Sequence, residues 1–409
     1  MYLSDAFADT FKATIHLENF VNDGSPSGHD RKSGIPTRYC PGDISGFFLS
    51  TVQGGKNDFK IRGPLDNADP WSEDIVNATL SSVRMPVYDF VLNNKAETFQ
   101  QIVFPTASTR TVICNPSNPY YIKLHFDSVI GRTSRHLRDI QCQKSDFLRT
   151  VFDQIIQDAN SNESLEEFGV LKESLSIYHP ESRIGCVLRD FQGFPYKQKN
   201  KRFILPFFSL VAQDTLNPSH SIILHQVEKK HPSVIGKVIL PMLLRTYMKL
   251  ALEYGIVNEF HGQNVLLEID QDLKPKRVII RDFQDCHLDN DFRELLGKPT
   301  FPEQLSFSGS SWNKHTVSMF RSMLFDFKFT EYLIKPLLDK SIEFSSYQED
   351  DKWAFCRVLL KEVIDSNNLE SAYKSYFASN MAFRFPRGKK IWDEKGPILI
   401  PHEPSKMRL

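Results

Sequence analysis

Polar side chains stand at both ends of two apolar runs between residues 259 and 283. The segment opens with the sequence EFHGQN and closes with RDF. The side-chain oxygens of Asn264 and Asp282 are ligands of the kind that Mg²⁺ prefers, and Glu259 and Gln263 could hold the ribose or base of a nucleotide. The chemistry that these residue types could support is the binding of a nucleotide together with a metal ion.

A structural role is the alternative for every one of these residues. A single histidine or aspartate beside a strand is more often a hydrogen-bonded structural residue than a catalyst. Burying so many polar side chains at one edge is costly, however, unless they bind something. We therefore treat the whole group, with His261 included, as one candidate site.

A second polar group lies upstream, at Ser108, Arg110, Thr111, Lys123 and Arg135. Guanidinium groups match the oxygens of phosphates and carboxylates with two parallel hydrogen bonds, so this set could hold a triphosphate or a polycarboxylate. Solvated surface charge is the usual explanation for an isolated lysine or arginine. Lys123 lies in the otherwise apolar run YIKL, which favours a functional role.

A third group, His29 with Lys32, lies in a loop of sequence SGHDRKSG. Glycines at both ends and charged residues between them are equally typical of an ordinary surface loop. These two residues become candidates only in combination with the motifs described below.

The elements that must position the first group are a hairpin and a helix. Apolar runs at 265–269 and 278–280 are separated by a polar turn, which predicts two antiparallel strands whose polar ends return to one edge of a sheet. Before them, an apolar stripe over residues 239–254 predicts a helix with Pro241 in its first turn and Gly255 at its end.

The remaining chain predicts a mixture of strands and helices. Ser145 suits the cap of a helix over residues 147–156, and Pro86 should interrupt a helix expected over residues 74–92. The other expected elements are strands at 99–111, 120–130, 184–191 and 203–211, helices within 317–340 and 352–365, and loops with short strands at 22–70.

The composition indicates an ordinary globular protein. With 409 residues, of which 41% are hydrophobic, the chain can bury a large core without disulfides or metals. Its formal net charge of +0 gives no field that would attract nucleic acid or an anionic membrane. Scattered cysteines, the lack of a signal-peptide pattern and the lack of a membrane-length apolar run predict a cytoplasmic protein.

Together these segments resemble the synthetases that make siderophores independently of nonribosomal peptide synthetases (NIS synthetases), the aerobactin-synthetase (IucA/IucC) family. That family has a Ser-x-Arg-Thr segment, a Lys-Leu strand followed by an arginine twelve residues later, and a His-Gly-Gln-Asn hairpin that ends in Arg-Asp-Phe. Residues 108–111 fit the first motif, Lys123 and Arg135 keep the spacing of the second, and the third is complete. The likeness runs from about residue 106 to the C-terminus.

The resemblance implies an α+β fold, with an antiparallel-sheet fingers domain at residues 22–219 and a helix-rich palm domain containing the β-hairpin at residues 220–409. Family members are usually longer and have an N-terminal thumb domain. Here the thumb would be reduced or absent, and residues 1–21 would be a residual N-terminal segment. The family's His-Pro-x-x-Lys segment is not matched in full, and His29 and Lys32 lie where it would fall.

The activity implied by the resemblance is that of an ATP-dependent ligase in siderophore biosynthesis. Such an enzyme adenylates a carboxylic acid, citrate or a related polycarboxylate, with release of pyrophosphate. It then condenses the acyl group with an amine or alcohol and releases AMP. The cofactors would be ATP and Mg²⁺, and the partners would be these small molecules, without nucleic acid or membrane; a homodimer is left open.

The resemblance also assigns roles to residues. The catalytic residues would be Lys123, Arg135 and His261, with His261 accepting the proton of the incoming amine, and Asp282 and Asn264 would hold the metal. The acid would contact Arg135, His261, His29 and Lys32. The ATP-binding set would consist of Ser108, Arg110, Thr111, Lys123, Arg135, Glu259, Gln263, Asn264 and Asp282.

Two alternatives belong to other functional classes. A kinase-like phosphotransferase of the aminoglycoside or choline kinase sort also binds Mg-ATP with a histidine loop, an asparagine and a later aspartate. It needs an aspartate two residues after the histidine, where this chain has Gln263, and a Gly-rich phosphate loop, which the start of this sequence lacks. The other alternative is a relative without catalysis that acts as a binding or accessory protein.

Overall fold

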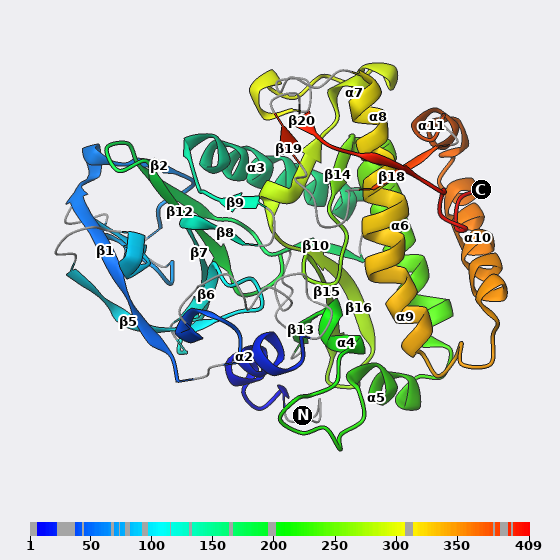
Figure 1. The fold of residues 1–409 in the computed structure, drawn as a ribbon, viewed down its shortest axis with the longest axis horizontal. Coiled ribbons are helices and arrows are strands. Elements are labelled where there is room, and N and C mark those ends of the chain that lie inside the picture. The colour runs from blue at the N-terminus through cyan, green and yellow to red at the C-terminus, as the bar shows by residue number, and fades with distance from the viewer. Residues whose placement is uncertain are drawn as a thin grey trace.

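The computed structural model contains two β-sheets and a layer of helices beside the second sheet. It describes residues 6–22, 37–42, 45–66, 69–72, 74–77, 82–91, 97–114, 116–130, 133–162, 167–194, 202–306, 314–378, 381–384, 392–393 and 396–409. In Figure 1 the larger sheet lies on the left, the smaller sheet in the centre, and the helices of residues 240–254, 335–340 and 349–366 on the right. The architecture is α+β, as predicted.

The larger sheet has nine strands in the order β2-β11-β12-β7-β6-β5-β1-β4-β3, with every neighbouring pair antiparallel. Its central strands β6 and β7 are buried along their full length, because a core rich in aromatic residues packs on one face and the second sheet on the other. The strands are β1 (Phe47–Gly55), β2 (Lys60–Arg62), β3 (Val76–Asn77), β4 (Ser82–Val87), β5 (Glu97–Pro105), β6 (Thr111–Cys114), β7 (Tyr120–Leu124), β11 (Leu175–His179) and β12 (Ile184–Asp190).

The smaller sheet contains the predicted hairpin. Strands β15 (Val265–Asp270) and β16 (Pro275–Ile280) pair antiparallel, which confirms the hairpin and brings its two polar ends to the same edge. Strand β13 (Arg202–Pro206) pairs with β15, and β10 (Phe168–Val170) runs parallel to β16. Strands from both sides of residue 219 therefore share this sheet, and the division into fingers and palm at that residue stays a prediction.

Helix α6 (Leu240–Tyr254) forms as the sequence predicts. Pro241 is the second residue of α6 and follows the π-helical segment η4 (Ile235–Ile239) closely, and Gly255 ends the helix in the left-handed conformation with a φ of 64°. A side chain at Gly255 would also collide with Arg293, since an added Cβ would lie 2.5 Å from the Cγ of that residue.

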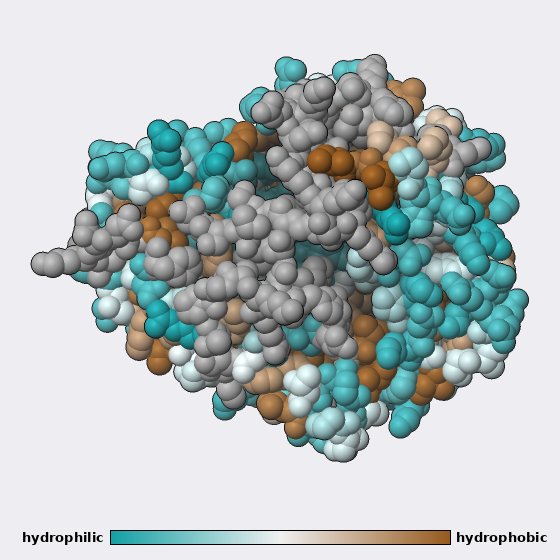
Figure 2. Space-filling view, viewed as in Figure 1, coloured by the Kyte–Doolittle hydropathy of each residue, from teal (hydrophilic) through white to brown (hydrophobic). Residues whose placement is uncertain are grey.

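The other helices and short elements complete the fold. Figure 2 shows a mainly hydrophilic surface over the right-hand helices, in keeping with α10, which buries Trp353, Cys356, Leu360, Val363 and Ile364. The helices are α3 (Asp139–Asn162), α4 (Phe207–Val211), α5 (Ile223–Lys230), α7 (Asn290–Leu295), α8 (Lys314–Ser322), α9 (Lys335–Lys340), α10 (Glu349–Ser366) and α11 (Glu370–Tyr376), with π-helical segments η4 (Ile235–Ile239) and η8 (Met323–Ile334). The short 3-10 turns are η1 (Thr37–Tyr39), η2 (Lys56–Asp58), η3 (Asp89–Val91), η5 (Phe283–Asp285) and η6 (Glu303–Leu305). Small strand pairs are β8 (Phe126–Ile130) with β9 (Thr133–Arg135), β14 (Ile256–Asn258) with β17 (Cys286–Leu288), β18 (Ala382–Arg384) with β21 (Ile400–His402), and β19 (Trp392–Asp393) with β20 (Gly396–Pro397).

Three of the predicted elements are wrong in whole or in part. The described part of residues 74–92 forms strands β3 and β4 instead of a helix. Pro86 is tolerated in β4 because backbone N–H groups alternate in direction along a strand, and that of Arg84 already points away from β1, toward Ile75. Helix α3 begins at Asp139, so Ser145 lies inside it. The strand expected at 203–211 ends at Pro206 and continues as α4.

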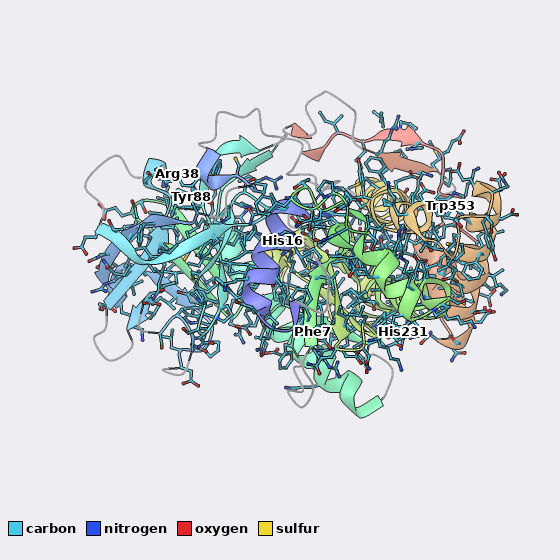
Figure 3. All side chains as sticks on the ribbon, turned by 90° about the horizontal axis from the view of Figure 1, so that it is seen from below. Phe7, His16, Arg38, Tyr88, His231 and Trp353 are labelled. Atoms are coloured by element: carbon cyan, nitrogen blue, oxygen red, sulfur yellow. The ribbon has the colours of Figure 1, made fainter. Side chains whose placement is uncertain are left out.

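Helix α2 (Thr10–Phe20) lies where the two sheets approach each other. Figure 3 shows this helix, marked by His16, between the strands of the larger sheet and the helices of the other half. Phe11 and Ile15 of α2 pack in one cluster with Tyr121 of the larger sheet and Ile279 of the smaller sheet. Residues predicted to be a residual segment thus fill the junction of the fold.

Candidate active site

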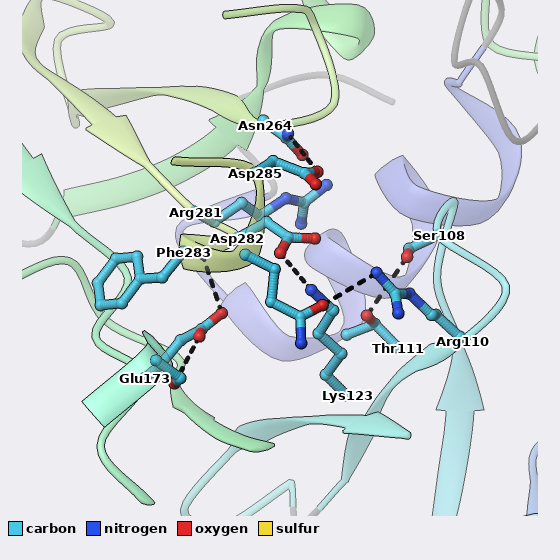
Figure 4. Close-up of polar contacts among 12 residues, drawn as sticks. Ser108, Arg110, Thr111, Lys123, Glu173, Asn264, Arg281, Asp282, Phe283 and Asp285 are labelled. Atoms are coloured by element: carbon cyan, nitrogen blue, oxygen red, sulfur yellow. Dashed lines mark hydrogen bonds and ion pairs between the residues drawn. The ribbon is translucent and has the colours of Figure 1, made fainter. Parts of the chain in front are cut away.

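The centre of the site is an ion pair between the two sheets. The ammonium group of Lys123, on β7, donates to the carboxylate of Asp282, the second residue after β16 (Figure 4). The two residues are 159 positions apart in the sequence. Their contact joins the Lys-Leu strand of the second motif to the Arg-Asp-Phe end of the third.

Burial and neighbouring charges shift the pKa values of both partners of this pair. It lowers the pKa of Lys123 to about 8, with Arg110 adding to the lowering and Asp282 opposing it. Burial alone would raise the pKa of Asp282, but the charges of Lys123, Arg189 and Arg110 hold it well below its usual range. Asp282 is therefore ionised at all physiological pH values, and Lys123 is the partner that loses its proton first on the alkaline side.

Sheet register places Thr111 next to Lys123. The two residues lie directly opposite each other on the antiparallel strands β6 and β7, and such pairs point to the same face. Thr111 donates from its hydroxyl to the Oγ of Ser108 at 3.3 Å, and its carbonyl accepts from the hydroxyl of Thr106 at 2.8 Å. These bonds hold the turn before β6 against the lysine.

The turn that contains Ser108 is strained at Thr109, which has a φ of 58°. A threonine pays a steric cost in this left-handed region, so the surrounding contacts must hold it there. The hydroxyl of Tyr88 donates to the carbonyl of Thr109 at 2.6 Å, and the backbone N–H of Thr109 reaches the carbonyl of Thr106 at 3.2 Å. Tyr88, the buried residue directly after β4, thus holds Thr109 in this conformation.

Arg110 spans the space between the sheets. Its guanidinium donates to the side-chain oxygen of Gln284 at 3.2 Å and to the backbone carbonyl of Arg135 at 3.3 Å. Burial lowers the pKa of Arg110, Asp282 opposes the lowering, and the charge of Arg135 adds to it. We call Arg110, Lys123 and Arg135 the cationic wall: Lys123 and Arg110 contact Asp282 and Gln284 in the turn after the hairpin, and Arg135 adjoins Arg110 through its backbone carbonyl.

The opposite wall is the turn after β16. Asp282 itself has a left-handed backbone with a φ of 72°, and Asn264 donates from its side-chain amide to the carboxylate of Asp285 at 3.1 Å. Burial raises the pKa of Asp285, and the charges of Asp282 and Glu259 raise it further. Two carboxylates and an amide oxygen are therefore concentrated at one point, although the sequence interpretation included only Asp282 and Asn264.

This donor set fits a magnesium ion bound jointly with phosphates. Among the described residues, no group of three or more His, Cys, Asp and Glu side chains is arranged to hold a metal alone. Mg²⁺ bound with a nucleotide needs only one or two carboxylates, since phosphates and waters supply the other ligands. The fit is supported by the contact of Asn264 with Asp285 at 3.1 Å, and by the nearby charge of Asp282, which raises the pKa of Asp285 and which a cation would offset.

Glu259 and His261 lie beside this wall. The carboxylate of Glu259 pairs with Lys328 of η8 at 3.0 Å and lies 3.8 Å from the Nε2 of His261. Burial alone would raise the pKa of Glu259, but Lys328 and His261 lower it to about 2. Burial, assisted by Lys328, lowers the pKa of His261 to about 3, so the imidazole is neutral at physiological pH.

The hydrogen bonds of the HGQN turn fix how His261 is presented. The backbone N–H of Gln263 donates to the Nδ1 of His261 at 3.3 Å, which leaves the proton of the neutral ring on Nε2, toward Glu259. Gly262 allows the turn to pack closely, because an added Cβ would lie 3.0 Å from the backbone nitrogen of Phe208 in α4. That nitrogen donates to the Gly262 carbonyl at 3.0 Å.

Several residues of the site were missed by the sequence interpretation. Glu173 accepts from the backbone N–H of Phe283 at 3.2 Å, from the hydroxyl of Ser145 at 2.7 Å and from Arg189 at 2.7 Å. Lys144 donates to the carbonyl of Gln284 at 2.9 Å. No sequence signal marks Glu173, whose neighbours Lys172 and Ser174 are polar, and nothing in the sequence connects Lys328 with Glu259.

The structure places ten of the predicted site residues in this region, and their roles stay predictions. The ten are Ser108, Arg110, Thr111, Lys123, Arg135, Glu259, His261, Gln263, Asn264 and Asp282. His29 and Lys32 lie outside the described residues. A cavity of about 200 Å³ beside α2, lined by Phe7, Tyr121 and Phe203 among others, lies apart from this arrangement.

Comparison with solved structures identifies the fold. The petrobactin biosynthesis protein AsbB from Bacillus anthracis str. Sterne matches with a TM-score of 0.69 at 14% identity, covering 99% of this chain and 79% of its own. ATP-bound aerobactin synthetase IucA from a hypervirulent Klebsiella pneumoniae matches with a TM-score of 0.67 at 14% identity, covering 99% of this chain and 80% of its own. The chain has the fold of the NIS synthetases. The resemblance inferred from the sequence motifs is thereby confirmed at the level of fold.

Other comparisons add less. Aerobactin synthetase IucC from the same Klebsiella pathotype matches with a TM-score of 0.62 at 13% identity, covering 92% of this chain and 77% of its own. Residues 237–343, which contain α6 and the hairpin, match the family described as ferric iron reductase FhuF-like transporter. A search of curated proteins finds no match by sequence. In the described part of the chain, no helix combines the length and apolarity needed to cross a membrane.

Proposed function

We propose that the chain is an ATP-dependent synthetase of siderophore biosynthesis that adenylates a carboxylic acid, citrate or a related polycarboxylate, and condenses it with an amine or alcohol. The observation that carries this proposal is the meeting of a cationic wall, centred on Lys123, with a carboxylate wall, centred on Asp282. Anions and a divalent cation can both be bound there, which is what a nucleotide with its metal requires.

The cationic wall would hold the phosphates and the acid. Ser108 and Thr111 offer hydroxyl groups, and Arg110, Lys123 and Arg135 offer positive charge within one buried region. Guanidinium groups suit carboxylates as well as phosphates, so Arg135 could contact the acid while Arg110 and Lys123 hold the triphosphate.

The opposite wall would hold the metal and the nucleoside. Asp282 and Asn264 would be the metal ligands, with Asp285 next to both, and Glu259 and Gln263 would contact the ribose or base. When bound, Mg²⁺ would neutralise charge on the phosphates as the transferring centre gains it. Asp282 would then exchange part of its contact with Lys123 for the metal, and the ammonium would turn toward the phosphates.

The reaction requires positioning more than acid–base chemistry. An oxygen of the ionised carboxylate attacks the α-phosphorus of ATP, and the bond to pyrophosphate breaks. The amine or alcohol then attacks the acyl carbon, AMP leaves with the former carboxylate oxygen, and the nucleophile loses a proton. His261 is the proposed acceptor of that proton. Because Nε2 already carries the proton of the neutral ring, the acceptor would be Nδ1, which would have to give up its hydrogen bond from the backbone N–H of Gln263, and the lowered pKa makes it a weak base until anions are bound nearby.

The test is pyrophosphate release across a panel of carboxylic acids in the presence of hydroxylamine, which traps the activated acyl group. We expect Mg²⁺-dependent release with citrate or a close relative, and a loss of about 10²-fold or more in Arg135→Ala and His261→Ala. Formation of ADP would support the kinase-like alternative instead, and Mg-ATP binding without turnover would support a non-catalytic relative. Full activity in both variants would refute the residue assignment.

A further inference from the structure

A buried carboxylate from the N-terminal helix connects the two walls of the site. Glu18, on α2, has no exposed surface. One of its oxygens accepts from the backbone N–H of Ala107 at 3.1 Å, next to the Ser108–Thr111 turn. Its carboxylate also accepts from the guanidinium of Arg281, the first residue of the RDF motif. No sequence motif used above includes Glu18.

Arg281 also bonds to residues of the HGQN turn. Its Nε donates to the carbonyl of Gln263 at 2.7 Å, and its backbone N–H donates to the carbonyl of Asn264 at 2.9 Å. Burial alone would lower the pKa of Arg281, but the charge and hydrogen bonds of Glu18 raise it. Glu18 is therefore the ionic partner of the residue that ties the HGQN turn to the RDF turn.

Helix α2 is anchored so that Glu18 cannot easily move. Asn19 donates to the carbonyl of Pro105 at 3.0 Å, and its side-chain oxygen accepts from the backbone N–H of Gly42 at 3.0 Å. On another side of the helix, His16 contacts Asp214 at 2.8 Å, and the carbonyl of Phe20 accepts from the backbone N–H of Thr215 at 2.9 Å.

We infer that Glu18 is a positioning residue that sets the spacing between the phosphate-binding turn and the metal-binding turn. This inference rests on the proposed function and deepens it, because α2 then forms part of the nucleotide site. Glu18 itself does not touch the reacting groups. It acts through Ala107 on the cationic wall and through Arg281 on Gln263, Asn264 and the adjoining Asp282.

A purely stabilising role makes a different prediction. If Glu18 only held α2 in place, its loss would lower the melting temperature without changing the affinity of the folded protein for nucleotide. If it sets the spacing of the walls, the folded protein would bind Mg-ATP more weakly, because small displacements of such groups are felt strongly.

The experiment is calorimetric binding of Mg-ATP to the full chain, the wild type compared with Glu18→Gln and His16→Ala. The His16 variant is the matched control, since it removes a contact of the same helix that lies on the side of Asp214, away from the two turns. We expect Glu18→Gln to raise the Kd for Mg-ATP, at equal folded fraction, by about 10- to 100-fold. His16→Ala should lower the melting temperature and leave the Kd within about twofold of the wild type.

Glu18→Asp covers the case in which the glutamine variant does not fold. The aspartate keeps the buried charge but is too short to reach Ala107 and Arg281 together, so we expect an intermediate Kd. Equal Kd values for the Glu18 variants and His16→Ala would overturn the inference. Wild-type binding of Mg-ATP without acid-dependent turnover would refute the proposed function alone, and absence of wild-type binding would refute both.

Discussion

At the residue scale, the site depends on one buried ammonium that neutralises one partly buried carboxylate. Lys123 has no exposed surface, and its partner Asp282 is close to Arg189 and Arg110 as well. Removing the lysine therefore has two effects: the phosphates lose a charge partner, and Asp282 loses its nearest hydrogen-bond donor.

Lys123→Met should lower acid-dependent adenylation by about 10²- to 10³-fold, because a charge aimed at the transition state is lost in a buried site. The free energy of unfolding should fall by about 1–3 kcal/mol, since Asp282 keeps only its more distant cations. Lys60→Met is the control, because Lys60 pairs with Asp139 at 2.9 Å while half exposed, and its loss should change stability by less than about 1 kcal/mol. Wild-type turnover in Lys123→Met would remove this lysine from the mechanism.

The pH profile tests the same residue without a mutation. The pKa of Lys123 is lowered to about 8 by burial first and by Arg110 second. We expect kcat/KM for ATP, which reports the free enzyme, to fall as pH rises through about 8. Asp282 stays ionised across the accessible range and should add no acid limb of its own.

As pH rises, the contribution of Lys123 to the free energy of unfolding increases while kcat/KM falls, so a loss of activity can be told apart from a loss of stability. The unfolded chain keeps the lysine proton up to about pH 10, whereas the folded chain releases it near 8, so the contribution of Lys123 to the free energy of unfolding rises between those values. A loss of activity there is therefore not caused by unfolding through Lys123. A kcat/KM that is flat up to pH 10 would contradict the lowered pKa.

At the scale of elements, the hairpin is the part that the sequence predicts best. Two apolar runs around a short polar turn predict an antiparallel pair, and β15 and β16 form it. Strand β4 shows why other elements were misjudged. Pro86 excludes a helix, and a single sequence does not reveal that its lost N–H would face away from β1.

Close packing of the HGQN turn on α4 gives a prediction at this scale. Gly262→Ala should lower the free energy of unfolding by about 1–3 kcal/mol, because the new methyl group would lie 3.0 Å from the backbone nitrogen of Phe208. The measurement is chemical unfolding, with Gly55→Ala as the control, where the nearest atom to an added Cβ is a side-chain oxygen at 3.6 Å. Equal effects of both substitutions would show that the turn can move away from α4 without cost.

At the scale of the whole molecule, the motifs converge because two sheets and one helix meet at a single place. Nearby motifs meet through local pairing, since Thr111 of the first motif and Lys123 of the second lie on neighbouring strands. Contacts between segments far apart in the chain could not be predicted from the sequence. Glu18 with Arg281 and Lys328 with Glu259 are single pairings across long separations, and no local pattern marks them.

Isotope transfer from the acid to AMP tests the central claim, that a carboxylate attacks the α-phosphorus of ATP, most directly. The acid that supports turnover is labelled with heavy oxygen in its carboxylates, and the AMP formed in the full reaction with the amine or alcohol is analysed by mass spectrometry. We predict AMP that carries one heavy oxygen atom, because the bridging oxygen of the acyl-adenylate leaves with AMP. Unlabelled AMP, or ADP with a phosphorylated acid, would contradict the adenylation mechanism.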